Sequence, residues 1–298
     1  MIQNFDSRNK DIKVWINGKL LHIDNAKVSV FDSVVQGGDA VWEGIRVYNG
    51  KIFCFDKHLN RLLESAKSIG FVDVPSITNI KNAVFSTLKA NGMKNDTHIR
   101  LTLTRGKKIT SGMNPKLNQF GTTLIVLAEW KPAIYQGKEL SLVTSSIRRL
   151  SPLFLDSKIH HANLLNNILA KIDANNAGVD DAIMLDIDGF VAETNSTNIF
   201  MVKNDVVYTS LPKACLPGIT RELVIDICKN NNIKLIEKDI SISEFYNADE
   251  VFTTGTMGEL ARVNLIDNRK IRNKGKILKS IKNHFKYLTQ QEGEILTF

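Results

Sequence analysis

The segment 216–222 has the composition of an anion site at the start of a helix. Gly218 precedes Ile219 and Thr220, in a turn that leads directly into a helix with apolar residues at regular spacing. Backbone N–H groups at a helix start have no partner within the helix, and a threonine hydroxyl adds one more donor, so a phosphate or carboxylate can bind there. An ordinary capped helix is the simpler alternative, because threonine is a common helix cap.

Two further segments carry polar groups that could complete such a site. At 252–256 a strand ends in three threonines and Gly255, so backbone and hydroxyl donors, including Thr256, can converge on a phosphate. A plain strand end has the same composition. In the segment 189–198, Glu193 lies between a short strand and a polar stretch rich in turn residues. Most glutamates are surface charges, so Glu193 indicates a site only in combination with the other segments.

The histidine and cysteine pattern predicts no metal site. His160 and His161 are adjacent, but neighbouring residues of a strand point to opposite faces, and no further cysteine or histidine ligand is near them in the sequence. The three cysteines, Cys54, Cys215 and Cys228, match neither a disulfide framework nor a CxxC motif. We expect them to be small buried residues, as cysteines without a disulfide usually are.

Turn residues and hydrophobic spacing predict that the first half of the chain is antiparallel and α+β in style. Two Asn-Gly pairs, at 17–18 and 49–50, are hairpin signals. Asp56 is expected to cap a helix that stops at Gly70. The elements expected here are strands at 14–16, 19–23, 41–48, 51–55, 98–104 and 122–130, and helices at 56–70 and 77–90.

A segment with proline and glycine punctuation and few apolar residues, 131–138, is typical of a linker. We therefore expect a smaller N-terminal α+β domain, 1–130, and a larger C-terminal α/β domain, 139–298. The second domain alternates strands with amphipathic helices, and it has no repeat of about 20–50 residues that would indicate a solenoid. Its expected elements are strands at 139–147, 182–186, 190–191, 198–202, 206–209, 233–236 and 251–254, and helices at 163–175 and 220–230.

Composition predicts a packed protein that neither crosses a membrane nor binds nucleic acid. Of the 298 residues 43% are hydrophobic, and no apolar stretch approaches the roughly 20 residues that span a bilayer. The polar stretch Met1–Lys13 lacks the apolar core of a signal peptide, so a cytoplasmic protein is expected. Much of the basic excess behind the net charge of +8 lies in 269–286, where Leu278, Ile281 and Phe285 recur at helical spacing. Aromatic residues do not interleave with the charges there, so the lysines are expected to form the solvated face of a helix.

Several of these segments, together and in this order, resemble motifs of the fold-type IV, or class IV, pyridoxal-phosphate aminotransferases. The family includes branched-chain aminotransferase, D-amino-acid aminotransferase and aminodeoxychorismate lyase. The resemblance covers almost the full chain, from Val14 to about Thr289, and its motifs are EGIR at 43–46, HLNRL at 58–62, DGFVAE at 188–193, LPGITR at 216–221 and ADEVFTTGT at 248–256. The first motif is most similar to the branched-chain branch.

The resemblance implies an α/β (in part α+β) architecture of two domains, like that of D-amino-acid aminotransferase, with pyridoxal 5'-phosphate bound in the cleft between them. It also implies a homodimer in which a loop of the neighbouring subunit completes each site. The cofactor ligands that it implies are Arg61, Ile219, Thr220 and Thr256 for the phosphate, Glu193 for the pyridine nitrogen, and Ser196 and Thr197 lining the cofactor. Arg100 and Arg105 lie on or just after a strand that borders the substrate pocket in the family, where a guanidinium can bind a carboxylate. A structural ion pair is the alternative for each of these two arginines.

The family's catalytic lysine, which binds the cofactor as an imine and transfers the α-proton, is missing from its usual position. In many relatives this lysine lies three residues before an asparagine that opens the next helix. Counting back from Asn163 leads to His160, and the run 165–171 matches the family without a gap. Imidazole cannot form the imine, but it can act as a general acid or base. Lys158, two residues earlier, would point to the same face as His160 if the segment were extended.

The resemblance favours a transaminase that moves an amino group between a branched-chain or related amino acid and a 2-oxo acid, with Lys158 or His160 as the catalytic residue. Two alternatives stay open. One is an enzyme without the lysine link, in which the cofactor is noncovalent or lost and His160 acts as acid and base; the other is a binding protein without catalysis. Leu164 stands where branched-chain enzymes tend to carry tyrosine and the D-amino-acid branch accepts leucine, so the substrate is open as well.

Overall fold

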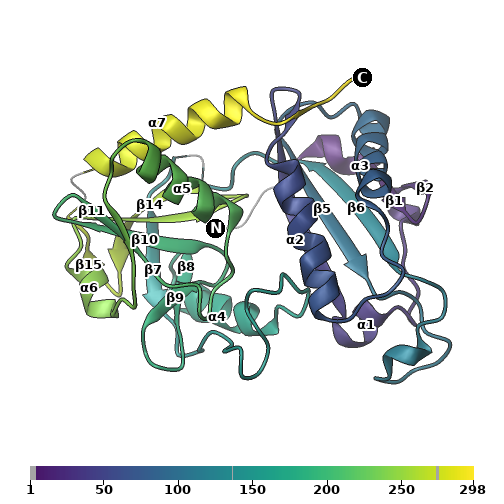
Figure 1. The fold of residues 1–298 in the computed structure, drawn as a ribbon, viewed down its shortest axis with the longest axis horizontal. Helices are drawn as coiled ribbons and strands as arrows, with labels where there is room; N and C mark the ends of the chain where they lie inside the picture. The colour runs from purple at the N-terminus through teal and green to yellow at the C-terminus, as the bar shows by residue number, and fades with distance from the viewer. Residues whose placement is uncertain (1–4, 136, 273–274) are drawn as a thin grey trace. The chain divides into compact units, whose positions relative to one another are not determined.

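The computed structural model of the chain describes residues 5–135, 137–272 and 275–298, which form two compact units (Figure 1). The N-terminal unit contains the described residues up to Pro132 together with Ile159–Asn163 and Gln290–Phe298, and the C-terminal unit contains Ala133–Lys158 and Leu164–Thr289. Residues 1–4 of the polar N-terminal stretch, residue 136 of the expected linker and residues 273–274 of the basic segment lie outside the described residues.

The sequence predicts one domain boundary, at 131–138. In the structure the chain also returns to the N-terminal unit in two later segments. In the first of them, His161 forms a bridge with Val41. In the second, β16 (Glu294–Ile295) pairs with β4 (Lys51–Ile52). Composition cannot reveal such pairing, because it joins residues that are far apart in the chain.

The N-terminal unit is an antiparallel sheet with two long helices on one face (Figure 1). Its elements are β1 Lys13–Ile16, β2 Lys19–His22, α1 Ser33–Gly37, β3 Ala40–Tyr48, β4 Lys51–Ile52, α2 Phe55–Ser68, α3 Ile77–Asn91, β5 Thr97–Thr104, β6 Thr123–Trp130 and β16 Glu294–Ile295, with 3₁₀ turns at Ser7–Asp11, Ile23–Asn25 and Pro115–Leu117. The strand order is β16-β4-β3-β5-β6-β1-β2, with α2 on β3 and α3 on β1 and β6. The two predicted hairpins, the two predicted helices and the two later strands are confirmed.

The start of α2 corrects one detail of the sequence analysis. Cys54 precedes the helix with φ of 51° and makes no side-chain capping hydrogen bond, while Asp56 lies in the first turn and is not the cap. The helix begins early because the preceding strand is shorter than predicted. His58, Arg61 and Ser65 then follow at intervals of three and four residues, which places them on one side of α2.

Alternation along β3 places a carboxylate among apolar side chains. Val41, Ile45 and Val47 belong to the core formed with α2 and α3, and all three are fully buried. Glu43 has the same parity in the strand, and its side chain is also fully buried. A buried carboxylate needs partners, because removing an isolated charge from water is very unfavourable. The core of this unit therefore contains a polar cluster.

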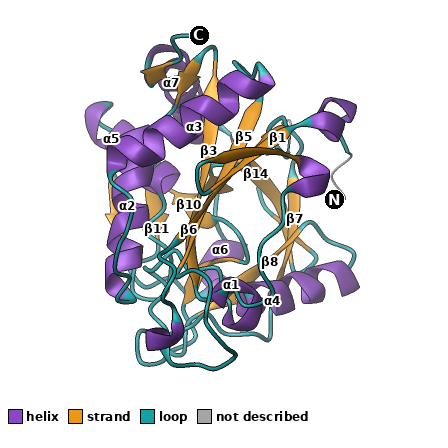
Figure 2. Ribbon diagram, turned by 90° about the vertical axis from the view of Figure 1, so that its right-hand side faces the viewer, coloured by secondary structure: helices purple, strands orange, loops and turns teal. Residues whose placement is uncertain are grey.

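The C-terminal unit is a mixed sheet with helices packed around it (Figure 2). Its elements are β7 Leu140–Thr144, α4 Leu165–Asn176, β8 Asp181–Leu185, β9 Val191–Thr194, β10 Asn198–Lys203, β11 Val206–Thr209, α5 Ile219–Asn230, β12 Leu235–Glu237, α6 Ile242–Tyr246, β13 Glu250–Gly255, β14 Glu259–Ile266, β15 Arg269–Lys270 and α7 Lys276–Gln291. The strand order is β12-β11-β10-β13-β14-β7-β8-β9, with β15 on β14, and β7 is parallel to both of its neighbours. The expected mixed α/β architecture is confirmed, and β14 and α6 are elements that the sequence analysis missed.

The helix α4 is confirmed, but its large apolar side chains do not enter a core. The four residues concerned, each between 41% and 62% exposed, are Leu165, Ile168, Leu169 and Ile172. Small side chains, Ala170 and Ala174, make the contact with β8 instead. The hydrophobic period therefore predicts this helix correctly, while the side that packs is the one with the alanines.

The remaining predictions from composition concern the last helix, the cysteines and membrane spans. In α7, Leu278, Ile281 and Phe285 are buried, as the spacing predicts. Cys215 and Cys228 are buried as expected, and Cys54 is half-buried. Among the described residues, no helix is long and apolar enough to cross a bilayer.

Candidate active site

Three segments of the C-terminal unit meet around Asn198, the first residue of β10. Asn198 pairs with Thr254 of β13. Its side-chain oxygen would lie 2.1 Å from a Cβ atom at Gly218, so the start of α5 approaches it closely and a larger residue does not fit. Beside it, a Cβ atom at Gly255 would lie 2.9 Å from Cγ2 of Thr197. The three segments that the sequence analysis selected are therefore neighbours in this unit.

Glu193, on β9, is buried and held by three donors. Nε of Arg149 donates to Oε1 at 2.6 Å, Nδ2 of Asn198 donates to Oε2 at 3.2 Å, and the backbone N–H of Leu216 donates to Oε1 at 3.3 Å. Burial raises the pKa of Glu193, while Arg149 and the Leu216 N–H oppose that rise. Such a carboxylate can accept a hydrogen bond from a positively charged group of a ligand.

The start of α5 offers donors without a side-chain cap. Gly218 is the residue before the helix and supplies no capping hydrogen bond, so the N–H groups of Ile219 and Thr220 have no partner within the helix. Oγ1 of Thr254 is buried and has no hydrogen-bond partner among the described residues. Thr256 lies in the turn after β13 and is half-buried. Together these groups can bind an anion.

The turn between β9 and β10 is fixed by its own hydroxyl groups. Oγ1 of Thr194 accepts the backbone N–H of Ser196 at 3.2 Å and that of Thr197 at 2.9 Å. The hydroxyl of Ser196 also bonds Tyr135, which donates to Asp181. Thr197 is buried and Ser196 is exposed. Ser196 and Thr197, the two residues predicted to line a cofactor, thus belong to a turn that hydrogen bonds hold in place beside Asn198.

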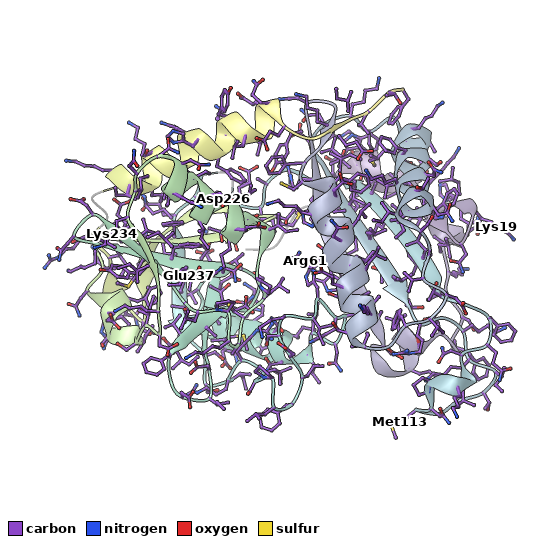
Figure 3. All side chains as sticks on the ribbon, viewed as in Figure 1. Lys19, Arg61, Met113, Asp226, Lys234 and Glu237 are labelled. Carbon is purple, nitrogen blue, oxygen red and sulfur yellow. The ribbon has the colours of Figure 1, made fainter. Side chains whose placement is uncertain are left out.

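In the N-terminal unit, Glu43 of β3 is the centre of a buried polar cluster. Its Oε2 accepts from Nδ1 of His58 at 2.7 Å and from Nη2 of Arg61 at 2.7 Å, and its Oε1 accepts from Nε of Arg61 at 2.8 Å. Burial raises the pKa of Glu43, but His160 and Arg61 outweigh this and hold it well below its usual range. Arg61, which Figure 3 labels on α2, is therefore engaged in a two-point ion pair.

His160 joins this cluster through its side chain and its backbone. Nδ1 lies 3.1 Å from Oε1 of Glu43, and the ring packs on Trp42 with the centroids 4.2 Å apart. The backbone N–H donates to Oγ of Ser65 at 3.1 Å, and the carbonyl accepts the backbone N–H of Trp42 at 3.0 Å. Burial lowers the pKa of His160 to about 4, while Glu43 opposes this shift and nearby arginines add to it.

Lys158 lies in a different environment from His160. Residues 157–158 form a turn, so the extended chain that would point both side chains the same way is not present. The Lys158 ammonium lies 3.6 Å from Oδ2 of Asp156, and 48% of its side chain is exposed.

The described residues contain no group of three or more histidine, cysteine or acidic side chains that could hold a metal ion.

The two arginines predicted to bind substrate differ from each other. Arg105 donates to Asp39 through Nε at 2.6 Å and Nη2 at 3.1 Å, and it also donates to two backbone carbonyls. Of the two alternatives for Arg105, the structure therefore shows the ion pair. Arg100 lies over the ring of Trp42, 3.3 Å from the ring centroid, and no hydrogen bond joins it to the described residues. Burial lowers the pKa of Arg100 to about 10, at which it is still charged at neutral pH. The donors of Arg100 are therefore not used by the described residues.

The residues that hold these groups in place are not among those predicted from the sequence. Glu43 is recognised there only as part of a motif, although a charged residue at a core position of an alternating strand is itself a signal. His58 shares one side of α2 with other polar residues, which helical spacing could have revealed. No local signal marks Arg149 or Asn198, because their contacts with Glu193 depend on how distant segments pack.

Comparison with known proteins identifies the family. The family model for Amino-transferase class IV matches residues 40–266. The chain belongs to the class IV aminotransferases. The matched part includes Glu43, Arg61 and His160 as well as Glu193 and the start of α5, so both polar clusters lie within the region that defines the family.

Individual class IV aminotransferases are similar over most of this chain. It is 57% identical over 288 residues to branched-chain-amino-acid aminotransferase-like protein 2 of Arabidopsis thaliana, a match that covers 96% of this chain and 52% of that protein. The chain thus spans about half the length of this relative. It is 40% identical over 287 residues to a putative branched-chain-amino-acid aminotransferase of Methanocaldococcus jannaschii, covering 95% and 98% of the two chains. The solved structure of a T.th. branched-chain amino acid aminotransferase with pyridoxamine 5'-phosphate is similar at a TM-score of 0.88 and 31% identity, over 95% and 96% of the chains.

Proposed function

We propose that the protein is a pyridoxal-phosphate-dependent aminotransferase that moves an amino group between a branched-chain or related amino acid and a 2-oxo acid. The observation that carries the proposal is the arrangement around Asn198, where the buried carboxylate of Glu193 and the uncapped start of α5 lie against the same side chain. Family membership supports amino-group transfer as the reaction. The names of the similar proteins support branched-chain amino acids as the substrate class.

The C-terminal unit fits a ligand that carries both a phosphate and a ring nitrogen. The N–H groups of Ile219 and Thr220 and the hydroxyl of Thr256 are suitable phosphate donors. The buried hydroxyl of Thr254, without a partner among the described residues, is the kind of group that a bound ligand satisfies. Glu193 suits a protonated pyridine nitrogen. Pyridoxamine 5'-phosphate, present in the solved structure of the T.th. relative, has both chemical features.

When bound, pyridoxal phosphate supplies an electron sink for the carbon that carries the amino group. Glu193 would accept the hydrogen bond of the protonated ring nitrogen, and Arg149 opposes the rise in the Glu193 pKa that burial causes, which favours the negative carboxylate. Ser196 and Thr197 line the cofactor. Arg61 is a further candidate for the phosphate through its place in the HLNRL motif alone, and its Nε and Nη2 bind Glu43.

Arg100 is the substrate-binding residue of this proposal. Its guanidinium lies over the ring of Trp42 and has donors that no described residue uses, so it can bind the carboxylate of an amino acid or a 2-oxo acid. Arg105 is not part of the proposed site, because Asp39 and backbone carbonyls use its donors.

We further propose a homodimer located in the cytoplasm. The exposed apolar side of α4 is a surface of the kind that another chain covers, and the family resemblance makes a second copy the expected partner. Cys215 and Cys228 are buried without a disulfide, which is usual in cytosolic proteins.

An amino-transfer assay tests the proposed function. The purified chain is incubated with pyridoxal phosphate, leucine, isoleucine or valine, and 2-oxoglutarate, and we expect glutamate to form. Glu193→Gln should abolish turnover and weaken cofactor retention, whereas Asp226→Asn, at an exposed position on α5 (Figure 3), should change neither. The proposal fails if no 2-oxo acid is aminated and if Glu193→Gln retains the cofactor as well as the unchanged chain does.

A further inference from the structure

The fold fixes the direction in which the two ring nitrogens of His160 point. Its backbone N–H is bound to Ser65 of α2 and its carbonyl to the N–H of Trp42 of β3. The imidazole then packs on the Trp42 ring, with 13% of the side chain exposed. Since both the backbone and the ring face are held, Nδ1 is directed to Glu43 and Nε2 lies on the opposite edge of the ring.

The contact with Glu43 determines which nitrogen carries the proton. The Glu43 carboxylate is ionised and can only accept, so the hydrogen bond of 3.1 Å requires a proton on Nδ1 of His160. Nη2 of Arg61 approaches the same nitrogen at 3.5 Å, but it has a shorter bond of 2.7 Å to Glu43. In the neutral ring the lone pair is therefore on Nε2.

Burial and two arginines keep this imidazole neutral, and Glu43 opposes them. Glu43 on β3 is negative, Arg61 on α2 and Arg100 on β5 are positive, and His58 on α2 lies on the other oxygen of Glu43. Burial is the largest influence and, with the two arginines, lowers the pKa of His160 to about 4. The ring is then unprotonated at neutral pH, and Glu43 can stabilise the charge that appears when Nε2 accepts a proton.

An imidazole at this position cannot replace the chemistry of a primary amine. It has no NH₂ group that could form a covalent link with an aldehyde, whereas it can accept and return a proton. Lys158 does not supply the missing amine, because it lies in a turn next to Asp156 and nearly half of its side chain is exposed.

We propose that His160 is the proton-transfer residue of this protein, that Glu43 is the residue that positions it, and that the cofactor is held by noncovalent contacts alone. This inference rests on the proposed function. In the transfer step the bond between the α-carbon of the substrate and its hydrogen breaks, Nε2 forms a bond with that hydrogen as a proton, and the electron pair stays with the substrate. Nε2 would then give this proton to the carbon that receives the amino group, which leaves His160 neutral again.

Borohydride reduction followed by mass measurement tests the absence of a covalent link. The full chain is loaded with pyridoxal phosphate, reduced and mapped by peptide mass, while equilibrium dialysis of an unreduced sample measures cofactor retention. We expect retention without stoichiometric attachment to any lysine, in the unchanged chain and in the matched control Lys158→Ala. His160→Lys should gain stoichiometric attachment at position 160.

The outcomes separate this inference from the proposed function. Stoichiometric attachment to Lys158, or to another lysine of the unchanged chain, overturns the inference and leaves the proposed function intact. Failure to retain pyridoxal phosphate in dialysis overturns the proposed function and the inference with it.

A spectroscopic measurement tests the role of Glu43 without relying on turnover. The chain has six histidines, so ¹⁵N-histidine labelling gives few signals, and His160→Gln assigns the one of interest by its loss. We expect a neutral ring with the proton on Nδ1, and a changed tautomer balance in Glu43→Gln. His160→Gln should reduce kcat by roughly 10²–10⁴-fold with cofactor retention unchanged within about twofold. A proton on Nε2 in the unchanged chain, or an unchanged kcat in His160→Gln, contradicts the inference.

Discussion

Nε of Arg149 lies 2.6 Å from Oε1 of Glu193, and both side chains are buried. The pair links the loop that follows β7 with strand β9. It gives the Glu193 carboxylate a fixed position and a nearby positive charge. Oε1 also accepts the N–H of Leu216, while Oε2 accepts one bond, from Asn198, so Oε2 can accept a further hydrogen bond from a ligand.

Removing Arg149 should destabilise the protein more than removing the whole pair. In Arg149→Met the Glu193 carboxylate loses its charged partner while buried, which typically costs about 3–5 kcal/mol. We expect a decrease of this size in the free energy of unfolding, measured by urea denaturation. Adding Glu193→Gln to the same chain should restore most of the loss, because no unpaired charge remains. Equal stability of the single and double variants would mean that the pair is not energetically coupled.

The close approach of Gly218 to Asn198 gives a second expectation. A Cβ atom at position 218 would lie 2.1 Å from Oδ1 of Asn198, so Gly218→Ala must displace a side chain that bonds both Glu193 and the Leu216 carbonyl. We expect a loss of about 1–3 kcal/mol in unfolding free energy, together with weaker binding of inorganic phosphate in calorimetry.

Two further variants test the cause of the effect at Gly218. Gly37→Ala is the matched control, because no atom lies within 4 Å of a Cβ atom there. Combining Gly218→Ala with Asn198→Ala should cost less than the sum of the two single changes, since the clash is gone. Strict additivity of the two changes would exclude the clash as the reason.

Local patterns predict the parts of this protein that depend on local structure. The start of α5 with Gly218 and Thr220 was recognisable because a glycine turn, a threonine and a helical period are contiguous in the sequence. The same holds for both Asn-Gly hairpins and for most helices and strands. Glu193 was found as well, but its role came from the resemblance, since a lone glutamate carries no signal of burial.

The errors of the sequence analysis have one physical cause, which is that tertiary packing decides between equivalent local patterns. The apolar residues of α4 have the spacing of a buried face, yet alanines on another side make the contact with β8. Arg105 and Arg100 look alike in the sequence, and only the positions of Asp39 and Trp42 distinguish an ion pair from an unbonded guanidinium. The extended chain that would align Lys158 with His160 is replaced by a turn at 157–158, which the local sequence does not reveal.

Arg100 and Arg105 should respond differently to the same change. Arg105→Met breaks an ion pair with Asp39 and should lower the unfolding free energy by about 1–3 kcal/mol, with little effect on KM. Arg100→Met should leave stability nearly unchanged and raise KM for 2-oxoglutarate roughly 10–100-fold, because a charge-assisted bond to the substrate is lost. Steady-state kinetics and urea denaturation distinguish the two. A raised KM in Arg105→Met at unchanged stability would reverse the assignment.

The exposed side of α4 should be needed for the proposed homodimer. Ile168→Glu places a charge in the middle of this apolar surface, where burial by a second copy would be very unfavourable. We expect the unchanged chain to sediment as a dimer and Ile168→Glu to sediment as a monomer in analytical ultracentrifugation. Lys229→Glu, an exposed position on α5 and away from α4, should remain dimeric. A monomeric unchanged chain would reject the homodimer.

The buried histidines should make the protein sensitive to acid. The pKa of His160 is lowered from 6.5 to about 4 by burial, and that of His98 to about 3 for the same reason. Between pH 6.5 and the lowered values the unfolded chain binds protons that the native chain does not, so these groups contribute stability that is fully present above pH 6.5 and is lost as the pH falls. For His160 the difference corresponds to at most roughly 3 kcal/mol. We expect the free energy of unfolding, measured with urea between pH 4 and 7, to depend less steeply on pH in His160→Gln and in His98→Gln than in the unchanged chain. An identical slope in all three proteins would show that His160 and His98 titrate alike in the native and unfolded states.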